Sequence, residues 1–144
     1  MGAPVNSHVM WQGSMLNWSS IIKFSLILSI AQIAIGTLST LLIGADNLVK
    51  QSATEMFTYQ YFPSALAGLV VLVFYAKQQF TKTLLHLTIA VTISTLLGFV
   101  VVSTLMGSLY FSPTWVIDLP IAVVSILVAT FVGSYFHGSN KQAT

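Results

Sequence analysis

Four long apolar stretches make up most of this chain, and its charged residues lie only at the borders of these stretches or between them. The 144 residues include five lysines and three acidic residues, and none of these charges falls in the middle of a stretch. A helix needs about 20 mostly apolar residues to cross the hydrocarbon core of a bilayer. The sequence therefore predicts an all-α integral membrane protein, folded as a bundle of four transmembrane helices.

The predicted spans cover residues 21–44, 57–76, 83–107 and 115–136, with tails at 1–20 and 137–144. The second span is the least sharply bounded, because its apolar run begins only at Phe62 and Pro63 follows at once. Proline is tolerated in the first turn of a helix, where its missing N–H loses no partner. Turn-forming residues at 44–47, 107–108 and 138–140 close the other three spans. Spans and connections use nearly the whole chain, so one membrane domain over residues 1–144 is expected.

The distribution of lysine between the two ends of the spans predicts the orientation in the membrane, because lysine is enriched in cytoplasmic connections. One end carries four lysines: Lys23, Lys77, Lys82 and Lys141. The opposite end carries one lysine and all three acidic residues: Lys50, Asp46, Glu55 and Asp118. Both termini are therefore expected on the cytoplasmic or equivalent side of the membrane (N-in and C-in).

Aromatic residues at the borders agree with this orientation, since Trp and Tyr favour the interfaces of a bilayer. The expected inner belt is Trp11, Trp18, Tyr75 and Tyr135, and the expected outer belt is Tyr59, Tyr61, Tyr110 and Trp115. Trp11, Met15 and Trp18 also stand at helical spacing. They predict either a short interfacial N-terminal helix along the inner leaflet or an unstructured tail with scattered aromatic residues.

Composition limits the classes of function. Only 6% of the residues are charged and none is arginine, so the basic patch and the arginine forks of a nucleic-acid site are missing. The chain has no cysteine, which excludes thiol catalysis, disulfides and iron–sulfur ligation. It also has no HExxH, GxSxG, P-loop or glycine-rich nucleotide motif. We therefore expect no enzyme, no cofactor, no metal and no nucleic-acid partner, with Glu55 and Asp118 as the one acid–base pair worth testing.

Small and hydroxylated residues form stripes along the spans, and such residues are the usual contacts between helices in a membrane. The first span carries Ser25, Ser29, Gln32, Gly36 and Ser39, the second a short stripe from Ser64 to Gly68, and the fourth Ala122, Ser125, Ala129 and Gly133. The third span has two such faces, Thr88 with Thr92 and Thr95, and Ala90 with Ser94 and Gly98. Most stripes are expected to pack the bundle internally. The face with Ser94 is the predicted contact with another subunit.

Five polar residues in the spans are candidate functional residues: Gln32, His86, Thr88, Thr92 and Asp118. Asp118 lies about one turn into the fourth span and should face the bundle. It serves either as a favourable charge at a helix N-terminus or as an ion or substrate ligand. Gln32 is expected to bond a neighbouring helix, for example a threonine of the third span, with a substrate contact as the alternative. His86 is expected to be a border residue or a hydrogen-bond partner rather than a metal or haem ligand.

Two families share part of this pattern. The segment Ala31-Gln32-Ile33-Ala34-Ile35-Gly36 and the short lysine-bearing turn before the third span are similar to the membrane-spanning four-domain proteins that accompany immune receptors. The extracellular cysteine loop of many such proteins is absent. The size of the chain and Ser64-Ala65-Leu66-Ala67-Gly68 resemble the bacterial ATP synthase protein I, whose acidic and basic residues in the third span have no counterparts here. Neither likeness supplies a site that can be carried over to this chain.

The spans combine many helix-packing residues with no charge at mid-membrane, where coupled transporters place their sites. We therefore expect a non-catalytic accessory or assembly subunit of a larger membrane complex. Its expected partners are the lipid bilayer and other integral membrane subunits or further copies of itself. The alternative is a small channel or transporter subunit that works as an oligomer. A water path beside Gln32 and the threonines of the third span would favour this alternative.

Overall fold

The computed structural model describes residues 16–48, 50–79, 81–112 and 114–140, which form helices with short connections. Helix α1 covers Trp18–Ile43, α5 covers Thr83–Met106 and α6 covers Trp115–Asn140. The second long helix is continuous over α3 (Ala53–Met56), η2 (Phe57–Tyr61) and α4 (Phe62–Gln78), and the short α2 (Ala45–Leu48) precedes it. Within the described ranges there is no strand, and four helices are long and apolar enough to cross a membrane. The predicted all-helical fold with four candidate spans is confirmed.

Two predicted boundaries are wrong by about a turn. The first helix begins at Trp18 rather than residue 21, because the Asn17 side chain caps it by accepting from the Ser20 N–H at 3.1 Å. The second candidate span begins at Ala53. The fourth candidate span, Trp115–Phe136, agrees with the prediction, and helix α6 continues beyond it to Asn140. Glycine costs an established helix only about 1 kcal/mol, so the turn residues at 138–140 do not stop it. Most of the predicted N-terminal interfacial helix falls on residues 1–15, outside the described ranges.

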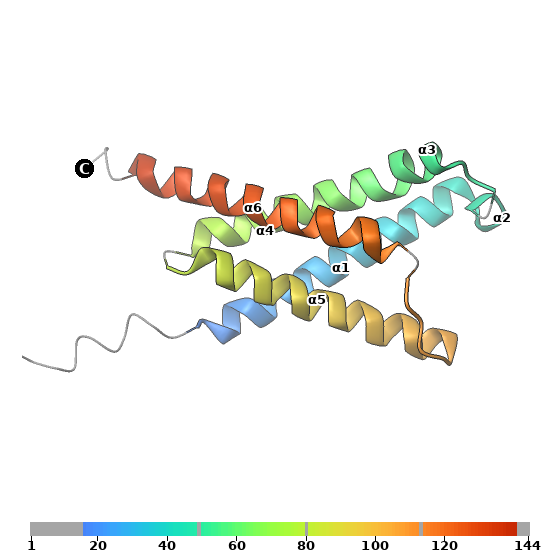
Figure 1. Ribbon diagram of the computed structural model, residues 1–144, viewed down its shortest axis with the longest axis horizontal. Helices are drawn as coiled ribbons and strands as arrows, with labels where there is room; N and C mark the ends of the chain where they lie inside the picture. Colours follow the sequence, from blue (N-terminus) through green and yellow to red (C-terminus); the bar gives the residue numbers. More distant parts are fainter. Residues whose placement is uncertain (1–15, 49, 80, 113, 141–144) are drawn as a thin grey trace, which may run out of the picture.

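Consecutive long helices run antiparallel, so their ends gather in two groups (Figure 1). The start of α1, the end of α4, the start of α5 and the end of α6 share one end of the molecule. The lysines of this end are Lys23, Lys77 and Lys82, and the acidic residues of the opposite end are Asp46, Glu55 and Asp118. The antiparallel order of the helices therefore places these three lysines and the three acidic residues at opposite ends of the molecule, as the predicted spans require.

The helices pack in crossing pairs rather than as a uniform bundle. Helix α4 crosses α6 and α1 crosses α5 (Figure 1), and these pairs together with α1 and α4 make the most extensive contacts. Helix α5 contacts α4 and α6 much less. Toward the end with the acidic residues, α1 and α5 diverge (Figure 1). One side of each is left open there.

The buried core lies near the crossings and draws on all four long helices. It consists of Ile21, Phe24, Leu28, Leu72, Tyr75, Ala76, Leu87, Ala90, Ile126 and Ala129. The Tyr75 ring is fully buried, stacked on Phe24 with the ring centroids 4.3 Å apart, and it meets the His86 ring edge-on at 6.4 Å. The prediction that Tyr75 belongs to the inner aromatic belt is therefore wrong. An aromatic residue near a span end can pack inward when a partner ring is available.

Helices α4 and α6 approach closely where Gly133 faces Ala76. A Cβ added at position 133 would lie 2.6 Å from the Ala76 Cβ and 3.1 Å from its carbonyl carbon. Glycine lets the two backbones come this close, as small residues do at helix contacts in membranes. Gly133 thus lies at a close internal contact, the kind of position predicted for it.

The π-helical turn η2 precedes Pro63, and the carbonyl it frees finds a partner on another helix. Proline has no N–H to donate to the carbonyl four residues before it, which here belongs to Tyr59. The Phe62 N–H bonds the Phe57 carbonyl, in the wider π-helical pattern. Ser39 Oγ of α1 donates to the Tyr59 carbonyl at 3.1 Å. A hydroxyl from the first span thus replaces the hydrogen bond that the second span lacks.

Candidate functional site

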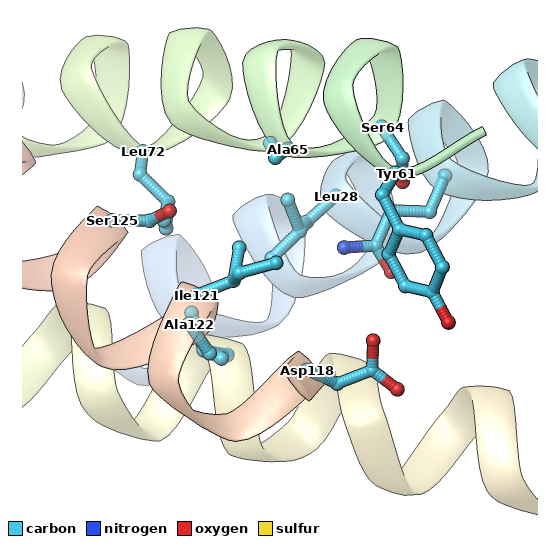
Figure 2. Close-up of a pocket in the computed structure, with 12 residues that line it drawn as sticks. Leu28, Tyr61, Ser64, Ala65, Leu72, Asp118, Ile121, Ala122 and Ser125 are labelled. Atoms are coloured by element: carbon cyan, nitrogen blue, oxygen red, sulfur yellow. The ribbon is translucent and has the colours of Figure 1, made fainter. Parts of the chain in front are cut away.

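A small pocket lies between α1, α4, α5 and α6, toward the end with the acidic residues. Its volume is about 110 Å³. Its lining residues are Leu28, Gln32, Tyr61, Ser64, Ala65, Gly68, Leu72, Val91, Asp118, Ile121, Ala122 and Ser125. Figure 2 shows Tyr61 and Asp118 at one end of this pocket and Leu72 and Ser125 at the other. The pocket therefore extends from the border of the predicted spans into their interior.

Gly68 makes room for the pocket on α4. A Cβ at this position would lie 3.7 Å from the Leu28 side chain and 3.9 Å from Gln32 Nε2. These are ordinary contact distances, so the missing Cβ leaves space beside the Gln32 amide without forcing the helices together. Ala65, one turn before Gly68, adds a second small side chain to the same wall.

Five side chains bring polar groups to the pocket: Gln32, Tyr61, Ser64, Asp118 and Ser125. Thr114 Oγ1 donates to Asp118 Oδ2 at 2.8 Å. Among the residues that the structure describes, the side chains of the other four make no hydrogen bond. Serine and threonine hydroxyls elsewhere in the helices commonly donate to the carbonyl four residues earlier, as Thr88 and Thr130 do. The pocket thus holds polar groups that other helix faces satisfy internally.

Three residues that the sequence singled out for different reasons meet in this pocket. Gln32 and Asp118 were candidates for intramembrane chemistry, and Ser125 was predicted to pack helices. Gln32 does not reach the threonines of the third span; its amide lies beside α4 instead. Asp118 is one turn into α6, and its own N–H bonds the Thr114 carbonyl at 2.9 Å. It lines the pocket as the predicted inward orientation requires.

Tyr61 and Ser64 also line the pocket, although the sequence did not suggest them as site residues. Ser64 did stand in the short stripe of the second span, and Tyr61 was assigned to the outer aromatic belt. The spacing of three residues between them places both on one helix face. That spacing was a usable signal, but it points to a pocket only once the facing helix is known.

His86 lies outside the pocket, near the lysine-bearing end, and joins α5 to the start of α1. Its ring is buried, with Nδ1 at 3.0 Å from the Lys82 carbonyl and Nε2 at 3.2 Å from the Asn17 N. A carbonyl can only accept, so Nδ1 carries the proton and Nε2 accepts from the Asn17 N–H. The structure thus shows His86 as a hydrogen-bond partner.

The two faces of the third span have opposite surroundings. Ser94 is buried, and its hydroxyl pairs with that of Ser29 on α1 at 2.9 Å. At Ser94 this face is therefore an internal contact with α1, and the prediction that it meets another subunit through Ser94 is wrong. Thr88 and Thr92 are exposed, and each hydroxyl donates to its own helix at 2.9 Å. Both faces carry small or hydroxylated residues in the sequence, and the crossing with α1 decided that Ser94 is covered.

Of the other residues predicted to pack helices, some are buried in the structure and some are not. Ser25 is fully buried and donates to the Ile21 carbonyl at 2.7 Å, and Ala129 is fully buried in the core. By contrast, a Cβ added at Gly36 or at Gly98 would have no described atom within 4 Å. Two glycines of the stripes therefore face open space.

The described residues hold no group of three or more His, Asp or Glu side chains that could bind a metal ion. Glu55 and Asp118 do not share a site. Glu55 Oε2 accepts from the Ser52 N–H at 2.9 Å and the Ser52 hydroxyl at 2.8 Å in a capping box, outside the pocket.

Comparison with known proteins found no matching family model, no similar curated protein and no similar solved structure.

Proposed function

We propose that this chain crosses a membrane four times with both termini on the cytoplasmic or equivalent side. The four apolar helices and the gathering of Lys23, Lys77 and Lys82 at one end support this orientation. Because the chain has no cysteine, single cysteines can report the side directly. A membrane-impermeant maleimide applied outside should label Ser108→Cys and not Gln78→Cys, both of which are exposed positions between helices or at a helix end. The reverse labelling would invert the orientation.

We further propose that the protein is a non-catalytic accessory or assembly subunit, which binds other membrane chains or further copies of itself through the outer halves of α1 and α5. The observation that carries this proposal is the open space beside Gly36 and Gly98. Glycines in spans allow close approach of a second helix. A Cβ at Gly68 or Gly133 would contact another helix, whereas a Cβ at Gly36 or Gly98 would have no atom of the described residues within 4 Å.

The outer half of α5 adds to the open surface. Leu105, two turns beyond Gly98 on the same side of the helix, exposes 82% of its surface, and only 11% of the most apolar window of each span is buried within the chain. Lipid can cover leucine and valine at no cost, but it cannot enter the shallow groove over a glycine as closely as a helix can. A partner helix across Gly36 and Gly98 would gain those contacts.

Bulky substitutions at the two open glycines test this proposal. Gly36→Leu and Gly98→Leu should abolish co-purification of partner chains, or self-association, while leaving the amount of protein in the membrane unchanged. The matched control is Ala34→Leu, an equally bulky change at an exposed position on the other side of α1. The measurement is mass spectrometry of chains that co-purify in mild detergent, together with the mass of the complex.

Two results would contradict the proposal. One is a wild-type protein that stays monomeric in membranes and in detergent with no co-purifying chain. The other is a complex that is unaffected by both glycine substitutions. The alternative of a conducting oligomer has less support, because Thr88 and Thr92 lie outside the pocket beside Gln32.

A further inference from the structure

The polar pocket adjoins an apolar groove between α4 and α6. The groove has a volume of about 360 Å³, and it shares Ala65, Ile121 and Ser125 with the pocket. Its other lining residues are Phe62, Leu66, Leu69, Pro120 and Val124. Together the two spaces are of the size usual for small-molecule sites, roughly 300–1,000 Å³. One end of this combined space is polar and the other is apolar.

The charge of the pocket selects the polar group that fits it. The ionisable residues that line the pocket are Asp118 and Tyr61, and no lysine is among the lining residues. Within the described part of the chain, the Asp118 carboxylate accepts one hydrogen bond, from Thr114 Oγ1, and makes no ion pair. A carboxylate near a membrane favours a cation beside it. The occupant should therefore carry a positive charge.

The neutral groups of the pocket select further among cations. Gln32, Ser64 and Ser125 offer oxygen acceptors that have no partner among the described residues. A primary ammonium group has three donors in a compact head, so beside the carboxylate it still has donors for the oxygens of Gln32 or Ser64, whereas Ser125 lies at the other end of the pocket from Asp118 (Figure 2). A multivalent metal ion would need more charged ligands than the single carboxylate present.

We propose that the pocket and the groove form one binding site for an amphiphile that carries a primary ammonium group on an alkyl chain. The ammonium lies beside Asp118 in the pocket. The chain follows the groove past Leu66 and Val124, where it exchanges contacts with lipid for contacts with α4 and α6. This inference goes beyond the proposed subunit function and stands without it.

Binding of dodecylamine to the full-length protein in phosphatidylcholine nanodiscs tests the proposal, with native mass spectrometry as the readout. Dodecanol has the same chain without the charge, and ethylamine has the charge without the chain. Both should bind at least about tenfold more weakly than dodecylamine. Dodecyltrimethylammonium, which has no N–H donor, should also bind more weakly.

The variant Asp118→Asn should weaken dodecylamine binding by about tenfold, because a charge-assisted hydrogen bond becomes a neutral one. The matched control is Asp46→Asn, an exposed acid at the same end of the molecule but outside the pocket, and it should bind as the wild type does. Gln32→Leu provides a second pocket variant if Asp118→Asn is poorly folded by circular dichroism.

Three results would overturn the proposal: equal affinity for dodecanol and dodecylamine, equal affinity for ethylamine and dodecylamine, or affinity that is unchanged in both Asp118→Asn and Gln32→Leu. Nanodiscs that contain phosphatidylethanolamine separate the two sources of the ammonium group. Preferential retention of this lipid, lost in Asp118→Asn, identifies a lipid headgroup. Dodecylamine binding without such retention identifies a free alkylamine, and either supports the shared chemistry.

Discussion

The contact between Gly133 and Ala76 allows a one-atom test of how α4 and α6 pack. Gly133→Ala adds a single methyl group, which would lie 2.6 Å from the Ala76 Cβ and 3.1 and 3.3 Å from its carbonyl carbon and oxygen. Backbone atoms cannot rotate away, so the two helices must separate or shift along each other.

The expected cost follows from two opposing terms. Overpacking a well-packed contact costs typically about 1–3 kcal/mol, and the collision with backbone places this variant in the upper part of that range. Alanine gains up to about 1 kcal/mol over glycine in helix propensity. We therefore expect Gly133→Ala to lower the free energy of unfolding by about 1–2 kcal/mol. Gly36→Ala is the matched control, since a Cβ there meets no described atom within 4 Å, and it should be neutral or slightly stabilising.

The assay is unfolding of the purified protein in mixed micelles by a denaturing detergent, followed by circular dichroism and by tryptophan fluorescence. The two variants are compared with the wild type under identical conditions. If Gly133→Ala were as stable as Gly36→Ala, the close approach of α4 and α6 at this point would be refuted.

Three further substitutions test hydrogen bonds in the same assay. Ser39→Ala should lower the free energy of unfolding by about 1 kcal/mol. This cost should be smaller in a Pro63→Ala background, because residue 63 then regains an N–H for the Tyr59 carbonyl. Equal costs in both backgrounds would refute the idea that the Ser39 hydroxyl replaces the hydrogen bond that Pro63 cannot make. His86→Leu should cost about 1–2 kcal/mol by leaving the Asn17 N–H without its acceptor, and unchanged hydrogen exchange at the start of α1 would contradict this. Tyr75→Phe should cost nothing and gain up to about 1 kcal/mol. Its hydroxyl is buried with no hydrogen-bond partner among the described residues, and the nearby Ser20 Oγ accepts from Gln79 Nε2 instead. A marked loss of stability would show that this hydroxyl is satisfied.

Much of the helical architecture was predictable from the order of apolar and charged residues along the chain. The length of each apolar stretch and the position of its border charges identify a span, because both depend only on the chain and the thickness of a bilayer. Helix ends were less predictable. Asn17 begins α1 earlier than expected, and residues 138–140 fail to stop α6, because capping and packing decide between competing local preferences.

The candidate site was predictable only in part. Gln32 and Asp118 stood out as polar residues in apolar surroundings, and both line the pocket. Their joint position with Tyr61 and Ser64 was hidden, since the four residues come from three helices that are far apart in sequence. The same applies to Ser94, whose partner on α1 depends on the angle at which the two helices cross.

The sequence by itself determined that four apolar segments form spanning-length helices, with four of the five lysines expected at one end and the acids at the other. Only the tertiary structure decided which small residues are contacts and which are open. Gly36, Gly68, Gly98 and Gly133 look alike in the sequence, yet a Cβ at Gly68 or Gly133 would contact another helix, and one at Gly36 or Gly98 would meet no described atom within 4 Å. The reason is that packing between helices depends on where they cross, and a crossing point is a property of two segments at once rather than of either one.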